Sequence, residues 1–458
     1  MVTRDRGSGP FSAPARISRR GLFRGGLGLA AGIGLAGGLS GCGNALSAGV
    51  AGTQLAPGTV TYWNLFGGGD GVRMVAMQDA YVKSTGSSPL QAATFAWGNP
   101  YYTKLSLATV GGAPPDVAIS HLTRMKNLAT ADLLTEITED MLSMVGLTPN
   151  DFNQKAWESA KLNGKTYCIP LDTHPFVMFY NKDVCQKAGL LDGSGNLKPI
   201  NGKSGWESAL KAAKQVTKAY GATVSTVGDT ATSWRWFQTL YSQRNGNTPW
   251  LGDGGRKLTY NKELTLDTLN WIQSLTKSGL MPANTDYAGA QTLMFTGKAA
   301  FYLEGEWEIS TAEAVPGLKF GMVPVPTIFD KPAAQADSHT FVLPRMNRSA
   351  DQMKRDMGFI KFLLSQSMTW AKGGHIPAYL PIKNSEAYKK LLPQANYAQA
   401  ANYAVYDAPA WYSGSGSNFE NIVGAQIGLV QQGLASPQSA LAAARSQLEI
   451  YSRTESPL

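Results

Sequence analysis

The alternation of apolar and polar positions predicts a chain of strands and helices in turn. A β-branched and aromatic run at residues 59–63 is typical of a strand. Four glycines within residues 67–71 end it, and a helix follows with apolar positions on one face from Val72 onward. Further strands are predicted at 90–95 and 116–120. This alternation favours an α/β fold whose largely parallel sheet is covered by helices.

Helical periodicity predicts four long helices farther along the chain. The first begins with a capping box at 204–207 and ends at Gly221. The other three are expected around residues 266–275, 353–364 and 437–451, where apolar side chains recur every three or four positions. Together with the strands they indicate long helices packed on sheets rather than an all-β chain.

The N-terminus predicts export. Residues 18–24 contain a twin-arginine pattern, a weakly apolar stretch follows, and residues 39–42 (Leu-Ser-Gly-Cys) are typical of a bacterial lipobox. Residues 1–41 are therefore expected to be a signal peptide, with Cys42 as the lipidated mature N-terminus and residues 42–58 as a flexible tether. A plain secretory signal with an incidental cysteine is the alternative, and general export remains an alternative to the twin-arginine route.

Composition and charge exclude several classes of protein. With 458 residues, 43% of them hydrophobic and 16% charged, the chain is too apolar for a disordered protein. The net charge of +9 arises largely in the first 41 residues, which hold six arginines and one acid. The remainder carries an ordinary charge for a globular protein and has no basic run, so no nucleic-acid partner is expected. The one weakly apolar stretch argues against a multi-span membrane protein.

The cysteine and histidine residues show no spacing typical of a metal site. Cys168 and Cys185 remain after Cys42, and outside the cytoplasm they form either a disulfide or two buried thiols. The four histidines are far apart in the sequence, with neither CxxC nor HExxH spacing. We therefore expect no metal and no cofactor.

Catalytic motifs are also missing from the sequence. There is no GxSxG elbow, P-loop or GxGxxG fingerprint. Glu304, Glu306 and Glu308 have the spacing of one strand face, which does not exclude a glycosidase pair, but solvated acids at a strand end are the favoured interpretation. The protein is thus predicted not to be an enzyme.

Aromatic residues at predicted strand ends are the strongest functional signal. Trp63 and Phe66 flank the end of the first strand, Trp97 follows the second, and Trp307 follows another. Ligand sites of open sheets lie beyond the carboxyl ends of strands. Aromatic rings cover the apolar face of a sugar while polar neighbours meet its hydroxyls. These positions therefore favour a carbohydrate ligand.

Several ordered segments carry a resemblance over the whole chain. They are residues 61–66, 111–117, 163–184, 297–307, 320–326, 359–364 and 374–377. In this order and spacing they resemble the extracytoplasmic sugar-binding proteins of bacterial ABC importers, family 1, the maltose-binding-like group.

The resemblance implies a two-lobe periplasmic-binding-protein-like fold of type II, with the ligand in the cleft between the lobes. Lobe one would comprise residues 59–172 and 342–378, and lobe two residues 173–341 and 379–458. The site residues that it implies are Asn64, Phe66, Ser120, His121, Asp172, His174, Trp234, Trp307, Trp411 and Phe419. His174 stands where maltose-binding relatives hold an acidic contact, and Trp234 is expected in a loop.

The implied function is capture of a sugar outside the membrane and delivery to the permease of an ABC transporter. The protein would be a monomer, attached to the extracytoplasmic face of the cell membrane only through its N-terminal lipid. Two alternatives stay open. The same fold could bind a phosphorylated polyol such as glycerol phosphate, with residues 67–71 at a helix start holding the anion. A secreted carbohydrate-active enzyme would also show surface aromatics, but it would cleave its ligand.

Overall fold

The computed structural model describes residues 55–86 and 89–457. Residues Leu55–Leu458 form one compact unit. The predicted signal peptide, the lipobox with Cys42 and most of the tether lie outside the described residues. Within the described part of the chain, no helix is both long enough and apolar enough to span a bilayer.

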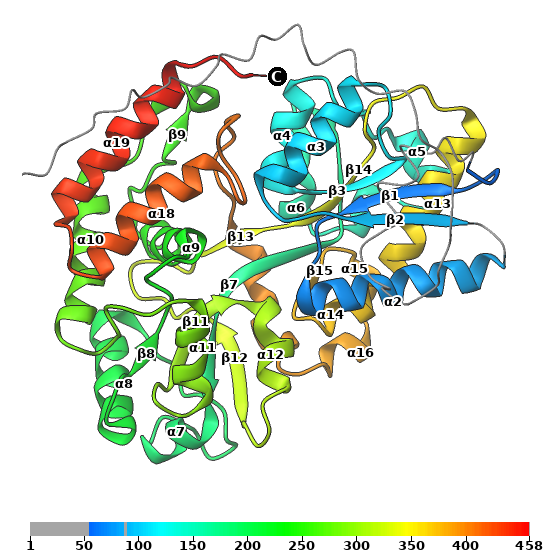
Figure 1. Ribbon diagram of the computed structural model, residues 1–458. Coiled ribbons are helices and arrows are strands. Elements are labelled where there is room, and N and C mark those ends of the chain that lie inside the picture. The colour runs from blue at the N-terminus through cyan, green and yellow to red at the C-terminus, as the bar shows by residue number, and fades with distance from the viewer. Residues whose placement is uncertain (1–54, 87–88, 458) are drawn as a thin grey trace, which may run out of the picture. The chain divides into compact units, whose positions relative to one another are not determined.

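The first lobe is built on a five-stranded sheet. Its order is β2 (Leu90–Thr94), β1 (Val60–Asn64), β3 (Val117–His121), β14 (His339–Val342) and β6 (Ile169–Pro170). The first three strands are parallel to one another, and β14 runs antiparallel to both of its neighbours. Its long helices, visible around the sheet in Figure 1, are α2 (Gly68–Thr85), α3 (Asn99–Val110), α4 (Leu122–Thr130) and α13 (Ala350–Ser365).

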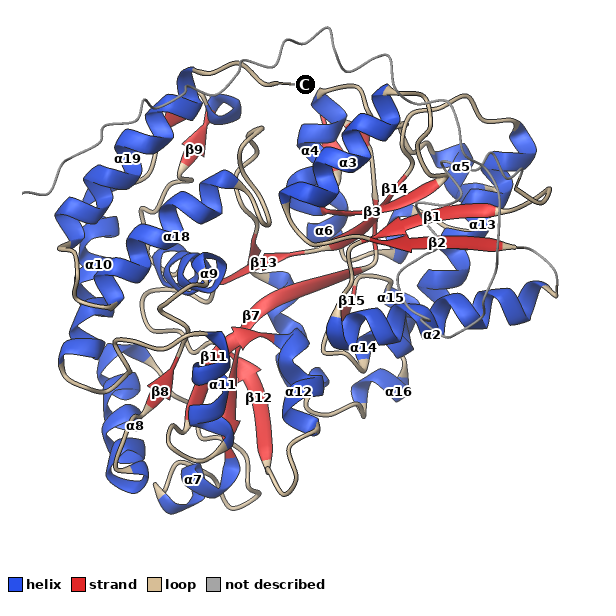
Figure 2. Ribbon diagram, in the orientation of Figure 1, coloured by secondary structure: helices blue, strands red, loops and turns tan. Residues whose placement is uncertain are grey.

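The second lobe is built on a seven-stranded sheet. Its main order is β16 (Ala404–Val405), β13 (Ala334–Asp337), β7 (Asp172–Asn181), β11 (Phe301–Gly305) and β8 (Ala222–Thr223), and β12 (Phe320–Pro324) and β15 (Ile376–Pro377) also pair with β7. Its helices, which flank the strands in Figure 2, include α7 (Lys182–Lys187), α8 (Gly202–Thr217), α9 (Thr230–Ser242), α10 (Lys262–Lys277), α11 (Tyr287–Phe295), α12 (Ile309–Glu313), α18 (Asn418–Gln431) and α19 (Pro437–Arg453).

Short elements complete the described chain. In the first lobe they are α5 (Glu139–Ser143), α6 (Gln154–Ser159), β4 (Lys161–Leu162), β5 (Lys165–Thr166) and α14 (Ser367–Ala371). Later in the chain come β9 (Leu251–Gly252), β10 (Lys257–Leu258), α15 (Leu380–Lys383), α16 (Glu386–Lys389) and α17 (Gln394–Tyr397). Each lobe has its own apolar core, and the second lobe has one on each face of its sheet.

The lobes are joined by three crossing segments. β7 passes between the sheets and pairs through Thr173 with β15, through His174 with β13, and through its later residues with β11 and β12. The second crossing is at Ser338, between β13 and β14, and the third is around β15, which pairs with the start of β7 while Tyr379 after it packs in the core of the first lobe. The strand His339–Val342 thus already belongs to the first sheet, although the resemblance assigned residues 339–341 to lobe two.

Two details of the predicted helices differ from the structure. α8 begins at Gly202 after Asn201, so Ser204 lies inside the helix and the expected capping box is not its start. Its end is Lys218 in the left-handed conformation, not Gly221. Gly221 instead passes so close to the backbone of Leu210 that a Cβ there would lie 2.5 Å from the Leu210 carbonyl oxygen. The remaining predicted long helices correspond to α10, α13 and α19.

The two cysteines of the body do not pair. Both are free and buried, Cys168 in the core of the first lobe and Cys185 in that of the second. The sequence left open a disulfide or two buried thiols, and the structure contains two buried thiols.

Candidate functional site

A cavity of about 330 Å³ lies between the two lobes. From the first lobe it is lined by Leu65, Phe66, Gly67, Asp70, Trp97, His121 and His339. From the second lobe it is lined by Asp229, Ala231, Arg235, Tyr287, Trp307 and Ser415, and the crossing strand β7 adds His174. Because both lobes contribute walls, opening and closing of the lobes would change access to this cavity.

Two tryptophans from opposite lobes face the cavity. Trp307 follows β11 in a short 3-10 turn, and its Nε1 donates to Tyr287 Oη at 3.1 Å. The Tyr287 hydroxyl in turn donates to Glu308 at 2.5 Å, and the Arg235 guanidinium lies 5.0 Å from the centre of the indole. Trp97 follows β2 and keeps 44% of its surface exposed. The cavity therefore offers aromatic faces with polar groups beside them.

All four histidines of the chain converge beside this cavity. His121 ends β3, His174 lies on β7, His339 begins β14, and His375 precedes β15. The ring of His339 lies 4.2 Å from that of His174, 4.9 Å from that of His121 and 5.4 Å from that of His375, between ring centres. Residues scattered in the sequence meet because three of them lie on or beside the crossing segments.

The Asp172 carboxylate organises this cluster. It accepts hydrogen bonds from His174 Nδ1 (3.1 Å), His339 Nδ1 (2.7 Å), the His339 backbone N–H (2.8 Å) and Trp370 Nε1 (2.6 Å). Burial acts to raise the pKa of Asp172, but the neighbouring imidazoles of His339 and His174 hold that pKa well below its usual range. Burial and the His339 ring lower the pKa of His174 to about 3, so its imidazole is neutral.

His375 is enclosed by three acids. Its Nε2 lies 2.9 Å from Asp70 Oδ1, and its Nδ1 lies 3.1 Å from Glu306 Oε1 and 3.4 Å from Asp172 Oδ2. Burial opposes its protonation, but these carboxylates raise the pKa of His375 well above its ordinary value. Burial also raises the pKa of Glu306 to about 7.

The glutamates at the end of β11 and in the turn after it, Glu304, Glu306 and Glu308, are not solvated, contrary to the favoured interpretation of their spacing. Glu304 and Glu306 are fully buried and Glu308 nearly so. Glu304 accepts from the Thr232 hydroxyl at 2.6 Å and lies 3.9 Å from Arg235, while Glu308 accepts from Tyr287 and Gln291. None of the three lines the cavity. Glu304 and Glu308 are hydrogen-bonded inside the second lobe, whereas Glu306 faces His375 without a hydrogen bond of its own. The strand spacing alone could not reveal this burial.

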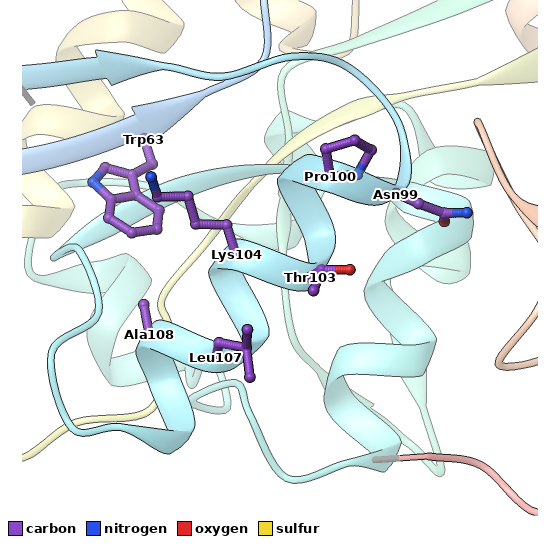
Figure 3. Close-up of a pocket in the computed structure, with 7 residues that line it drawn as sticks. All are labelled: Trp63, Asn99, Pro100, Thr103, Lys104, Leu107 and Ala108. Atoms are coloured by element: carbon purple, nitrogen blue, oxygen red, sulfur yellow. The ribbon is translucent and has the colours of Figure 1, made fainter. Parts of the chain in front are cut away.

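A second hollow lies on the outer face of the first lobe. Trp63, Asn99, Pro100, Thr103, Lys104, Leu107 and Ala108 line it, as Figure 3 shows. Apart from Trp63 of β1, all of these residues belong to α3. Because it has no wall from the second lobe, we take the cavity between the lobes as the candidate site.

Residues 93–369 match the family model described as bacterial extracellular solute-binding protein. The chain belongs to this family. A solute-binding protein of two lobes places its ligand where both lobes supply contacts, in accord with the position of the cavity.

Individual relatives of this solute-binding protein are distant. The arabinooligosaccharide-binding protein of Bacillus subtilis is 26% identical over 65% of this chain and 68% of its own length. A sn-glycerol-3-phosphate-binding periplasmic protein of Rhizobium meliloti is 26% identical over 49% of this chain and 51% of its own, so the chain spans about half of that relative. The GacH receptor of Streptomyces glaucescens superposes with a TM-score of 0.69 at 18% identity, covering 88% of this chain and all of that one, which shows the shared type II fold.

The structure brings some of the sequence-predicted site residues together and leaves others apart. Phe66, His121, His174 and Trp307 line the cavity. Asn64, Ser120 and Asp172 lie just behind it and are buried. Trp234 and Phe419 lie on α9 and α18 and pack on each other in the core of the second lobe, with ring centres 4.9 Å apart. Trp411 packs against Tyr451 and donates to Thr454, away from the cavity.

The site residues chosen from the sequence do not include six polar groups that line the cavity, namely Asp70, Asp229, Arg235, Tyr287, His339 and Ser415. Asp70 lies in the first turn of α2, Asp229 caps α9, Arg235 lies one residue after the tryptophan that was expected in a loop, and Tyr287 begins α11. Of these, Arg235 could have been recognised from its position in the sequence. On a helix that begins at Thr230, Trp234 and Arg235 point to different faces, so only one of them can face the core.

Proposed function

We propose that this protein captures a carbohydrate outside the membrane and delivers it to the permease of an ABC transporter. The supporting observation is the pair Trp97 and Trp307, which approach one cavity from opposite lobes among hydrogen-bonding side chains. Indole faces cover the C–H face of a sugar, and Asp70, Asp229 and Arg235 offer acceptors and a donor for its hydroxyls. The arabinooligosaccharide-binding relative supports the same ligand class, as does a maltooligosaccharide solute-binding lipoprotein of Streptococcus pneumoniae that is 24% identical over 66% of this chain.

The cavity size narrows the proposal to a small sugar. Its volume of about 330 Å³ is at the lower end of the range of roughly 300–1,000 Å³ for ligand pockets. We infer one or two sugar rings within the closed cleft. We propose that the sugar contacts include four residues chosen from the sequence, namely Phe66, His121, His174 and Trp307. We also propose lobe boundaries near residues 172, 338 and 378.

A phosphorylated polyol is the second candidate, and Arg235 is the observation that favours it. Its guanidinium lines the cavity, and a named relative binds sn-glycerol 3-phosphate. Two carboxylates, Asp70 and Asp229, line the same cavity, and Arg235 already lies 3.7 Å from Glu420. This balance of charge favours a neutral ligand over an anion.

A thermal-shift screen separates these candidates. The mature protein is heated with mono- and disaccharides, with arabinose and glucose oligomers, and with glycerol phosphates, because a ligand of the folded state raises the unfolding midpoint. We expect a neutral sugar to give the largest shift. A shift with glycerol phosphate alone would reject the carbohydrate proposal, and recovery of cleaved sugar after long incubation would reject binding without turnover.

Anchoring belongs to the same proposal. We propose that residues 1–41 direct export by the twin-arginine route, that Cys42 carries the lipid, and that the protein works as a monomer on the extracytoplasmic face. The support is the residue order Leu39-Ser-Gly-Cys42 and the paired Arg19 and Arg20.

A further inference from the structure

Four buried side chains at the crossing segments have the composition of a transition-metal site. We call Asp172, His174, His339 and His375 the hinge tetrad; each offers a ligand atom, and these atoms lie within 4.8 Å of one another. From the Asp172 oxygens, the Nδ1 atoms lie at 3.1 Å for His174, 2.7 Å for His339 and 3.4 Å for His375. Ligand atoms about 2.0–2.2 Å from a tetrahedral Zn²⁺ lie roughly 3.3–3.6 Å apart, so shifts on the order of 1 Å would bring the four atoms of the tetrad into this geometry.

A second observation points to a cation at this place. Asp70 engages His375 Nε2 at 2.9 Å, while the buried Nδ1 makes no well-aligned hydrogen bond and lies 3.4 Å from Asp172 Oδ2. Both carboxylate oxygens of Glu306, one of them 3.1 Å from His375 Nδ1, are likewise buried without a hydrogen bond. Two carboxylates that meet at one imidazole nitrogen need a positive charge between them, which the protonated His375 ring supplies in the metal-free protein and a bound cation can supply in its place.

The tetrad also has the outer support typical of metal ligands. Asp70 orients His375, and the indole N–H of Trp370 and the backbone N–H of His339 orient the Asp172 carboxylate. Such second contacts fix the tautomer and direction of a ligand before the metal arrives. Here they leave the three Nδ1 atoms directed toward one carboxylate.

We propose that the hinge tetrad binds a transition-metal ion of the Zn²⁺ class. Three imidazole nitrogens and one carboxylate oxygen suit Zn²⁺, Ni²⁺ or Cu²⁺ and do not suit Mg²⁺ or Ca²⁺, which prefer oxygen ligands. His174 and His339 bind through Nδ1 in the tautomer that carries its proton on Nε2, and His375 binds through Nδ1 after that nitrogen has released its proton to solvent. The ion joins all three crossing segments, since the tetrad has members on or beside each of them.

The hinge tetrad shares His174 with the proposed sugar contacts and borders the same cavity. It is therefore tested with the metal alone, in a measurement that needs no sugar. The mature protein, prepared without a histidine tag, is stripped with a chelator and titrated with ZnCl₂ against a chromophoric competitor. Co²⁺ is added in parallel, because tetrahedral Co²⁺ has intense visible bands. We expect one equivalent of tight binding, tetrahedral Co²⁺ bands, and a higher unfolding midpoint with zinc.

Variants locate the ion. His339→Gln and His174→Gln should each weaken zinc binding by ~100-fold or more. Removal of a residue that only supports a ligand weakens metal binding by about 10–100-fold, and removal of a ligand itself should weaken it at least as much. His121→Gln is the matched control, a histidine of the same cavity outside the tetrad, and it should bind zinc as the wild type does. Metal-free unfolding midpoints of all the proteins show whether each variant folds; a variant that does not fold is replaced by His375→Asn.

Three results would overturn the proposal. The first is that the wild type does not bind zinc. The second is that folded variants of the tetrad bind zinc with the affinity of the wild type. The third is that His121→Gln loses as much zinc affinity as the tetrad variants. Binding of Mg²⁺ as tight as that of zinc would reject the assigned metal class.

Discussion

The indole of Trp307 is positioned by neighbours on several sides. Tyr287 accepts its N–H, Arg235 lies over its face, and Gly305 lies against it, where a Cβ would collide with the ring. Gly305 has a φ of −70°, which any residue adopts, so the missing side chain makes room for the indole rather than for an unusual backbone. A side chain at position 305 would therefore displace the indole.

Replacement of Trp307 tests its role in ligand binding. Trp307→Ala should weaken binding of the sugar found in the screen by about 1–3 kcal/mol, the range for a central aromatic anchor. Gly305→Ala should weaken it as well, by displacing the ring without removing it. Isothermal titration calorimetry measures both effects.

Trp63→Ala is the control for this pair, because Trp63 lies in the outer hollow of Figure 3 and not in the cavity between the lobes. Its affinity should equal that of the wild type. A large loss of stability with unchanged affinity in Trp307→Ala would assign the indole to packing instead.

Asp407 links stability to pH. Its carboxylate accepts from Trp234 Nε1 at 3.0 Å, and burial together with the charge of Glu420 raises the pKa of Asp407 to about 8. Between about pH 4 and pH 8 the unfolded chain has lost this proton while the folded protein keeps it. The folded state then binds more protons, so this group makes the free energy of unfolding fall as the pH rises.

Asp407→Asn should remove this pH dependence, because the amide oxygen can still accept from Trp234 but nothing ionises. The stability of the variant relative to the wild type should rise across this window by up to about 1.4 kcal/mol per pH unit. Urea unfolding at about pH 5 and about pH 7.5 measures it, with exposed Asp140→Asn as the control. A difference that stays constant with pH would contradict the assignment.

At the scale of elements, local patterns predicted most of the framework. The β-branched run before the glycines is β1, and the periodic stretches are α10, α13 and α19. Trp234 was expected in a loop, yet it lies on α9 and is buried, because the apolar face of that helix completes the core of the second lobe. Trp234, Phe237 and Tyr241 have the spacing of one helix face, but the polar residues between them obscured this pattern in the sequence.

The site was harder to predict because it is assembled from long-range pairings. His339 reaches His121 through the β3–β14 register, and no local spacing encodes that pair. The burial of Glu304 and Glu306 likewise depends on Thr232 and His375, which are distant in the sequence. Phe66 and Trp307 could be chosen because each lies at the end of a strand, a position that sequence reasoning can recognise.

Helix-to-helix contacts across the cleft hold the lobes together. Arg73 on α2 donates to Ser310 on α12 at 3.0 Å, and a Cβ at Gly69 would also lie 3.0 Å from the Ser310 side chain. Asn99 on α3 donates to Asn418 on α18 at 3.2 Å. These bonds form only while the lobes are close, so they bias the hinge toward closure.

Arg73→Ala should therefore favour the open arrangement. We expect ligand affinity to fall by about 1 kcal/mol, the usual net value of one hydrogen bond, mainly through faster dissociation. Stopped-flow kinetics measures the rates, and small-angle scattering should show a larger radius of gyration for the unliganded variant than for the unliganded wild type. Lys83→Ala, near the other end of α2, is the control, and an Arg73→Ala protein with wild-type kinetics would exclude this contact from closure.

At the scale of the whole molecule, attachment to the membrane is predicted to depend on one thiol. Cys42→Ser should abolish lipid attachment, because the hydroxyl does not accept the diacylglyceryl group at a lipobox. Fractionation of cells should find the variant either released or unprocessed. Cys168→Ser, a buried thiol of the body, is the control and should remain in the membrane fraction. A processed Cys42→Ser protein that fractionates with membranes would refute the lipobox.

Each lobe is built from segments that are distant in the sequence, and this arrangement determines when the protein can fold during its synthesis. The core of the first lobe needs Trp370, and that of the second needs Leu448 on the last helix. A ribosome that has released only the first half of the sequence has therefore supplied neither core in full. Folding must largely follow synthesis, and an incomplete nascent chain exposes the apolar strand β7 to aggregation. Loss of α19 would then impair not only the C-terminal end but the whole second lobe.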